Sequence, residues 1–284
     1  MRSIAPAIDK VDRAVFERQP LSDWACELPG HTWPEDWPSL AQLEALRLAA
    51  IQRDAIDRPE FVVQSPMLLA DGLHYEERIR LGRLATRERN WHDLLNALVW
   101  LRYPRIKHAL NIAQCADIAV VGSRIRTRAQ CAMTHFDEAG AIVLCSDPRL
   151  IALWDRHDWH GLFWREREAW GTRIGVLVFG HAVLELALQP ERLLLAKSLA
   201  VMVEAGDIES LGRDSASVHG RVDQQVAGLI GSRHALTDPQ DQRPLPLSGI
   251  PGWNPAGASE AFFAQAPCFR PLREGRRYPT VQAW

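Results

Sequence analysis

The chain has 284 residues, of which 47% are hydrophobic, so it is long enough to bury a large core in one domain. Its formal net charge is -2, which gives no electrostatic case for binding nucleic acid or an anionic membrane. Lysine occurs only at positions 10, 107 and 197, and the other basic residues are arginine. No run of about eighteen apolar residues is present, so no membrane span is expected.

The five cysteines are widely spaced and form no CxxC motif. This pattern argues against a disulfide framework and against a cysteine-type zinc site, and it fits a reducing compartment. The first twenty residues are interrupted by charges and contain no apolar stretch typical of a signal peptide. We therefore expect a cytoplasmic protein.

Residues 1–60 are expected to form N-terminal helices and an arm that packs on the main domain. A short amphipathic helix is predicted over residues 4–18. Residues 20–38 form a Trp- and Pro-rich irregular arm, and a helix begins at Ser39 and runs to about residue 51. The main domain is expected over residues 61–284, with an irregular tail from about residue 234, where Pro and Gly become frequent.

The central stretch of the main domain covers residues 90–111. Asn90 is a good N-cap, and Pro104 cannot continue a helix, so a helix is predicted from Trp91 to Arg102. Pro104 suits the first turn of a second helix, to about residue 113. Before this stretch, residues 61–64 are typical of a strand, and residues 75–84 contain β-like pieces.

Residues 130–146 resemble a β-hairpin, with a turn at residues 137–140. Asp147-Pro148 is a typical helix start, followed by two short helices that break near residues 157–159. Residues 171–179 contain an apolar run that fits either a strand or a helix entry. Further helices are predicted over residues 180–188, 191–204 and 208–230. The sequence thus indicates a mainly helical α+β domain with a small antiparallel hairpin or sheet.

Three polar residues lie in the central helix, which is otherwise strongly apolar: His92, Asp93 and Asn96. A helix with apolar residues on most of its surface is buried, so these polar groups need partners. They either line a functional site or make structural hydrogen bonds, with Asp93 serving as a helix cap.

Two helical pairs suggest a metal site. His92/Asn96 and His181/Glu185 are each spaced by one turn, so each pair shares one face of its helix. If the two helices face each other, His92, His181 and Glu185 can ligate Zn, Fe or Mn, and Asp93 can complete the site or orient an imidazole. The alternative for His181 is a core histidine that is hydrogen-bonded to Glu185 or to backbone.

Other enzyme patterns are weaker. His92-Asp93 is the dipeptide used by metal-dependent phosphohydrolases of the HD class, for which His74 and either Asp147 or Asp155 would supply the remaining ligands. The surrounding pattern does not match that class. The sequence contains no GxGxxG, GxxxxGK[ST] or GxSxG motif, which argues against standard nucleotide enzymes and α/β-hydrolases.

Several segments together resemble a bacterial family known as domain of unknown function 3025: YEERI, NWHDLLNALVWLRYPRIKHALN, THFDEAG, LFWREREAW, FGHAVLE, PLSGIPGWNP and CFRPL. They span the chain from about residue 61 to near its end. The resemblance implies no activity or cofactor. It suggests that the polar residues within these motifs converge, which adds Lys107, Asn111, Asp137 and Glu138 to the candidates. Asp137 and Glu138 also fit simple turn chemistry.

The sequence therefore supports two functional hypotheses. The first is a hydrolase that acts on a small-molecule substrate, either with or without a divalent metal. In it His92 or His181 is a ligand or general base, Glu185 and Asp93 are ligands or orienting groups, and Asn96 is a hydrogen-bond donor to the substrate. The second is a non-catalytic binding protein whose polar cluster stabilises the core. The sequence does not indicate an oligomeric state.

Overall fold

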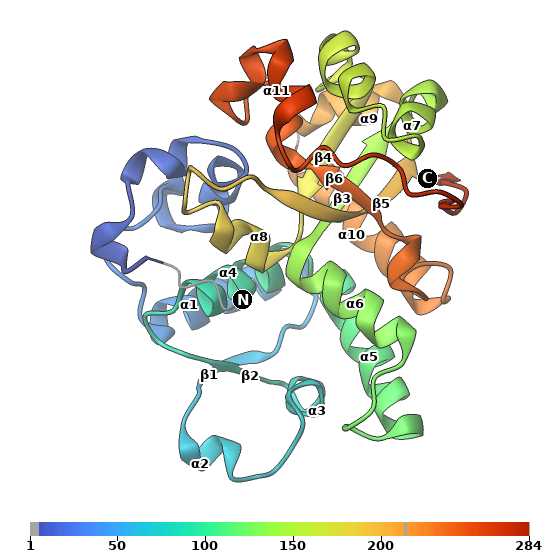
Figure 1. Cartoon of the computed structure of the whole chain (residues 1–284). Coiled ribbons are helices and arrows are strands. Elements are labelled where there is room, and N and C mark those ends of the chain that lie inside the picture. The colour runs from blue at the N-terminus through green and yellow to red at the C-terminus, as the bar shows by residue number, and fades with distance from the viewer. Residues whose placement is uncertain (1–5, 213–214, 284) are drawn as a thin grey trace.

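The computed structural model describes residues 6–212 and 215–283 of the chain (Figure 1). Its main sheet contains β3 (Gly140–Cys145), β4 (Ile174–Val178), β5 (Leu195–Met202) and β6 (Arg243–Pro246). Their order in the sheet is β4-β3-β5-β6, and the short β7 (Gln282–Ala283) pairs with β5. β3 is antiparallel to β4 and parallel to β5, and β5 is antiparallel to β6. The sheet is thus mixed.

Helices make up most of the regular structure, so the prediction of a mainly helical α+β domain is confirmed. They are α1 (Leu40–Asp54), α2 (Pro66–Leu69), α3 (Tyr75–Arg80), α4 (Trp91–Arg102), α5 (Pro104–Val121), α6 (Arg128–Ala139), α7 (Pro148–Asp155), α8 (His181–Leu186), α9 (Ala205–Glu209), α10 (Ser215–Gly231) and α11 (Glu260–Gln265). Among the residues described, no helix is long and apolar enough to cross a membrane.

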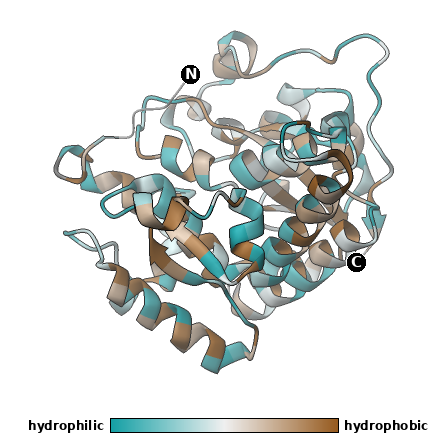
Figure 2. Ribbon diagram, turned by 90° about the horizontal axis from the view of Figure 1, so that it is seen from below, coloured by the Kyte–Doolittle hydropathy of each residue, from teal (hydrophilic) through white to brown (hydrophobic). Residues whose placement is uncertain are grey.

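The core is formed by β3 and by the helices around it. Every residue of β3 is buried, as is every residue of α4 except His92. Most helices carry both hydrophobic and hydrophilic residues along their length, as expected for helices with one face against the core (Figure 2). A second, two-stranded parallel sheet, β1 (Glu60–Val63) and β2 (Arg83–Thr86), lies beside α1 and α3.

The N-terminal arm inserts aromatic rings into the rest of the molecule. Trp24 and Trp33 are buried, and Trp33 stacks on Phe16 with ring centroids 4.6 Å apart. Trp91, at the start of α4, contacts Phe16, Trp33 and Trp37. The arm therefore covers the start of the central helix.

The helix predicted over residues 91–102 has the expected bounds, because the side chain of Asn90 accepts from the Asp93 N–H and Pro104 opens the next helix. The predicted start of α7 is also present, since Asp147 caps it and Pro148 is its first residue. Helix α1 begins after Ser39, as predicted, with a reciprocal capping box to Gln42.

Four predicted elements are wrong. The hairpin over residues 130–146 is instead α6 followed by β3, because Thr127 and Gln130 form a capping box that starts a helix. The helix over residues 191–204 is the strand β5. The β-like pieces at residues 75–84 are the helix α3 and the start of β2. Residues 8–17 form two 3₁₀ turns rather than one helix.

Parts of two predicted helices, residues 4–5 and 213–214, lie outside the described residues.

Candidate metal centre

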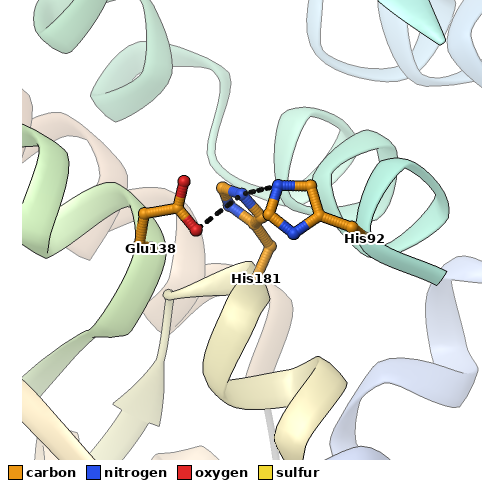
Figure 3. Close-up of side chains that lie close together, drawn as sticks. All are labelled: His92, Glu138 and His181. Atoms are coloured by element: carbon orange, nitrogen blue, oxygen red, sulfur yellow. Dashed lines mark hydrogen bonds and ion pairs between the residues drawn. The ribbon is translucent and has the colours of Figure 1, made fainter. Parts of the chain in front are cut away.

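His181, the first residue of α8, and His92, the second residue of α4, lie close together where the two helices pack against each other. Nε2 of His181 lies 3.0 Å from Nε2 of His92, and it lies 3.5 Å from Oε2 of Glu138 at the end of α6. Figure 3 shows the three side chains pointing toward one another from three different helices. One ligand atom from each, all within 4.8 Å of one another, makes a group that can hold a metal ion.

These spacings match the requirements of a small metal site. Zinc bonds of about 2.0–2.2 Å in a tetrahedral arrangement place neighbouring ligand atoms about 3.3 Å apart. The two distances to His181 Nε2, 3.0 and 3.5 Å, bracket that value. Two imidazoles and one carboxylate leave the fourth position open for water, which is the donor set of several catalytic zinc sites.

Glu185 supports His92 from the side opposite to His181. The Nδ1 atom of His92 donates to Oε2 of Glu185 over 3.1 Å. A carboxylate bound to the far ring nitrogen fixes the tautomer and leaves Nε2 free to ligate a metal. On this geometry Glu185 lies where it would orient His92, which is one of the two roles, ligand or orienting group, that the sequence left open for it. Glu138, and not Glu185, joins His92 and His181 in the group of side chains that could hold a metal ion.

The pKa values of the two histidines are shifted in opposite directions. Burial lowers the pKa of His181 to about 3, and the charges of Lys107 and His92 act in the same direction. Burial also lowers the pKa of His92. The hydrogen bond from Glu185 and the charges of Glu138 and Glu185 outweigh it, so the pKa of His92 lies above its ordinary value. His181 is therefore held neutral, the form that ligates metal.

Burial acts on Glu138 too, and together with the nearby Asp137 and Glu185 it raises the pKa of this carboxyl. The Nδ1 atom of His181 is buried and has no hydrogen-bond partner of good geometry, although the nearby backbone of Asp137 acts to raise the pKa of this ring. The carboxylates of Glu138 and Glu185 thus flank the two imidazoles, and the nearby Asp137 is paired with Lys107. A divalent cation would relieve this concentration of negative charge.

A second network lies beside the three ligand candidates. Lys107 is 4% exposed, and its Nζ donates to Oδ1 of Asp137 over 2.5 Å and to Oδ1 of Asn96 over 3.0 Å. Nδ2 of Asn96 in turn donates to the hydroxyl of Tyr75 over 3.1 Å. Lys107 thus fixes Asp137, the residue before Glu138, against α4 and α5.

The remaining candidates have structural partners. Asp93 accepts from the backbone and guanidinium of Arg87, at 2.6 to 2.9 Å, and so secures the start of α4. Asn111 donates to the backbone carbonyl and carboxylate of Glu76 on α3. Of the residues considered for an HD-class site, Asp147 caps α7 and pairs with Arg173, and Asp155 pairs with Arg243. Neither approaches His92 within ion-pair distance.

A cavity of about 180 Å³ adjoins the centre, and Glu138 and Asp137 line it. Its other walls come from α3, α5, α6 and the loop between the latter two, and they are mainly polar: His74, Tyr75, Glu76, Gln114, Ser123, Arg126, Gln130 and Thr134, with Ile118 and Ile125. Small-molecule sites are concave, with a few converging polar groups. This cavity could admit a small polar molecule to Glu138.

Two glycines, Gly140 and Gly180, allow the end of α6 and the start of α8 to approach each other closely. A Cβ atom on Gly180 would lie 2.4 Å from the backbone nitrogen of Gly140 and 2.5 Å from Cα of Ala139. Phe136 on α6 also stacks on Phe179, with ring centroids 4.9 Å apart. The close backbone approach and the stacked rings hold His181 beside Glu138.

A family profile described as "Protein of unknown function (DUF3025)" matches residues 59–273. The chain belongs to this family. The suspected family membership is therefore confirmed, and the matched region of this DUF3025 protein contains every residue of the candidate centre and of the Lys107 network. No curated protein and no solved structure matches the chain significantly.

Sequence reasoning named His92 and His181 together but gave Glu138 only a secondary place. The signal for Glu138 was its motif, THFDEAG, whose Asp and Glu also fit a turn. The structure shows that these residues end a helix, so that Asp137 and Glu138 project toward different partners.

Proposed function

We propose that this DUF3025 protein is a metal-dependent hydrolase whose metal, zinc in the first instance, is bound by His92, Glu138 and His181. The observation that carries the proposal is the convergence of two imidazole Nε2 atoms and a carboxylate oxygen, from three helices, at ligand–ligand spacings. Three protein ligands leave a coordination position for water, and zinc lowers the pKa of such a water to about 7.

The other residues have distinct parts in this proposal. Glu185 holds the ring of His92 in the tautomer with a free Nε2. Lys107 and Asn96 fix Asp137 at the wall of the cavity, and the hydroxyl of Tyr75 is held by Asn96 on the same side. A substrate in the cavity would thus meet Glu138 and hydrogen-bonding groups, as hydrolysis of a polar bond requires.

The first test is metal content. Purified, untagged protein is stripped with chelator and dialysed against zinc, and the bound metal is measured by elemental analysis. We expect about one zinc per chain in the wild type, and at least about tenfold weaker binding in His92→Gln and Glu138→Gln. Both side chains are partly exposed, 31% and 43%, so these variants should remain folded.

His160→Gln is the matched control, since His160 forms an exposed ion pair with Glu260 and lies on another part of the surface. It should bind zinc like the wild type. Wild-type protein that takes up no zinc, iron or manganese would refute the metal site. Equal zinc binding by Glu138→Gln and wild type would refute the assignment of Glu138 as a ligand.

The second test addresses hydrolysis. The zinc-loaded protein is screened with chromogenic carboxylic esters, amides and phosphate esters, beside Glu138→Gln and the chelator-stripped protein. We expect turnover only in the loaded wild type. A protein that binds zinc stoichiometrically but cleaves none of these bonds would separate the metal site from the hydrolase proposal. It would favour a binding protein whose centre is structural.

A further inference from the structure

The cavity beside the candidate metal centre carries one permanent positive charge on its walls. Three carboxyl side chains line it, those of Glu76, Asp137 and Glu138, but among the described residues of its lining Arg126 is the only lysine or arginine. Arg126 lies in the loop between α5 and α6 and is exposed. A molecule that enters the cavity can therefore reach its guanidinium.

Contacts on both sides fix the position of Arg126 relative to α6. The hydroxyl of the next residue, Thr127, donates to Oδ2 of Asp117 over 2.7 Å and accepts from the Gln130 N–H over 3.0 Å. The guanidinium of Arg126 itself turns toward α6, where Nη1 lies 3.4 Å from the hydroxyl oxygen of Thr134. The loop thus holds this side chain against the helix that carries Glu138.

Arg126 and Glu138 lie at neighbouring points along one face of α6. Gln130, Thr134 and Glu138 follow one another at intervals of four residues, so they share a face of the helix, and all three line the cavity. Four residues of α-helix rise by about 6 Å. Because Arg126 contacts Thr134, its guanidinium lies about one helical turn from Glu138. A small molecule can therefore touch both residues at once.

The charge of Arg126 is available to a ligand. Within the described part of the chain, no carboxylate lies within 4.0 Å of its guanidinium. The neighbouring carboxylates have other partners. Asn111 donates to Glu76 over 2.7 Å, and Lys107 pairs with Asp137. Burial raises the pKa of Glu76, and Arg126 acts in the opposite direction from beyond ion-pair distance.

We propose that Arg126 forms a carboxylate-binding subsite of the candidate centre, and that the substrate is a small N-acylated amino acid. Its carboxylate would bind Arg126, and its amide bond would lie at Glu138 and the metal. This inference rests on the proposed hydrolase function. Guanidinium groups bind carboxylates through two parallel hydrogen bonds. A single guanidinium in a cavity with three carboxyl groups favours a ligand with one negative charge over a doubly charged phosphate ester.

The spacing of the two groups also favours this class. In an N-acylated amino acid only the nitrogen and the α-carbon separate the amide carbon from the carboxylate, which suits two binding points about one helical turn apart. In the reaction, the oxygen of a water molecule bonds to the amide carbon and the C–N bond breaks. A proton from that water goes to the leaving nitrogen, so the products are a carboxylic acid and the free amino acid.

The test compares N-acetylglycine with N-acetylglycinamide, which keeps the amide bond but lacks the negative charge. Binding to the full chain is measured by isothermal titration at low salt, with zinc-loaded and with chelator-stripped protein, and hydrolysis is followed in the loaded protein as release of acetate. In both forms of the wild type we expect the acid to bind about tenfold more tightly than the amide. Arg126→Gln should remove this preference.

Arg124→Gln is the matched control, because Arg124 is exposed in the same loop but does not line the cavity. It should keep the preference for the acid. Equal binding of acid and amide by the wild type would overturn the proposal, as would an equal loss in Arg124→Gln. So would a preference that appears only with zinc and survives Arg126→Gln, since the carboxylate would then bind the metal.

The outcomes also separate this subsite from the proposed function. A preference for the acid that depends on Arg126, without hydrolysis of either probe, would refute the hydrolase function and support the carboxylate subsite. Hydrolysis of both probes at equal kcat/KM, unchanged in Arg126→Gln, would support the hydrolase function and refute the subsite. Thermal melting checks that each variant is folded.

Discussion

The ion pair between Lys107 and Asp137 gives the sharpest prediction about the centre. Substitution Lys107→Met keeps the length of the side chain but removes its charge, which leaves the Asp137 carboxylate without its 2.5 Å partner. Breaking a buried pair in this way costs about 3–5 kcal/mol. Asp137 retains 24% exposure toward the cavity, so water can solvate part of its charge, and we expect the lower end, about 3 kcal/mol.

The free energy of unfolding is measured in urea by tryptophan fluorescence for the wild type, Lys107→Met, Asp137→Asn and the double variant. Removing both charges should restore part of the loss, giving a coupling energy of about 1–2 kcal/mol. The ion pair does not hold Asp137 in place if Lys107→Met lowers the free energy of unfolding by less than about 1 kcal/mol. The same conclusion follows if the effects of the two single substitutions are strictly additive in the double variant.

The same pair has a defined pH dependence. Burial raises the pKa of Asp137, but the charge and hydrogen bond of Lys107, together with the nearby His181 and His92, outweigh it, so the pKa in the folded protein lies below the ordinary 3.8. A lowered pKa stabilises the fold above the unfolded value, and this stabilisation disappears as the pH falls through the folded value. The difference between wild type and Lys107→Met should therefore be largest near neutral pH and should shrink below about pH 4.

Two further predictions concern other parts of the fold. Gly180→Ala should lose zinc binding and about 1–3 kcal/mol of stability, because its Cβ would lie about 2.5 Å from the backbone of Ala139; elemental analysis with thermal melting would contradict this if zinc binding is unchanged. Burial raises the pKa of Asp223 to about 6, above its ordinary value. The stabilisation that the protonated carboxyl gives the folded protein is therefore lost as the pH rises through that value. Asp223→Asn should lack this loss between pH 4.5 and pH 7.5 in urea titrations, and parallel profiles for the two proteins would refute the assignment.

Helix boundaries were predictable where a cap and a proline coincide in the sequence. Asn90 before α4 and Asp147-Pro148 before α7 are local signals, and no tertiary contact is needed to interpret them. The capping box of Thr127 and Gln130 was equally local, but the turn-like sequence at residues 137–140 outweighed it. The result was a predicted hairpin in place of α6.

Strand β5 could not be recognised from local preference. Its sequence, LAKSLAVM, is rich in residues that favour helices, and its place in the middle of the sheet comes from pairing with β3 on one side and β6 on the other. The context of the sheet overrides intrinsic preference here.

The candidate centre shows that the spacing of two residues along a helix predicts which side chains lie together, but not the chemical role of each one. His181 and Glu185 share a face of α8, as their spacing requires. Because His92 packs against that face, Glu185 reaches the Nδ1 side of the His92 ring, while His181 faces its Nε2 side. A carboxylate one turn along the same helix therefore orients the neighbouring helix's histidine. The third group of the candidate centre comes from another helix, α6, and the close backbone approach at Gly180 brings Glu138 beside His181.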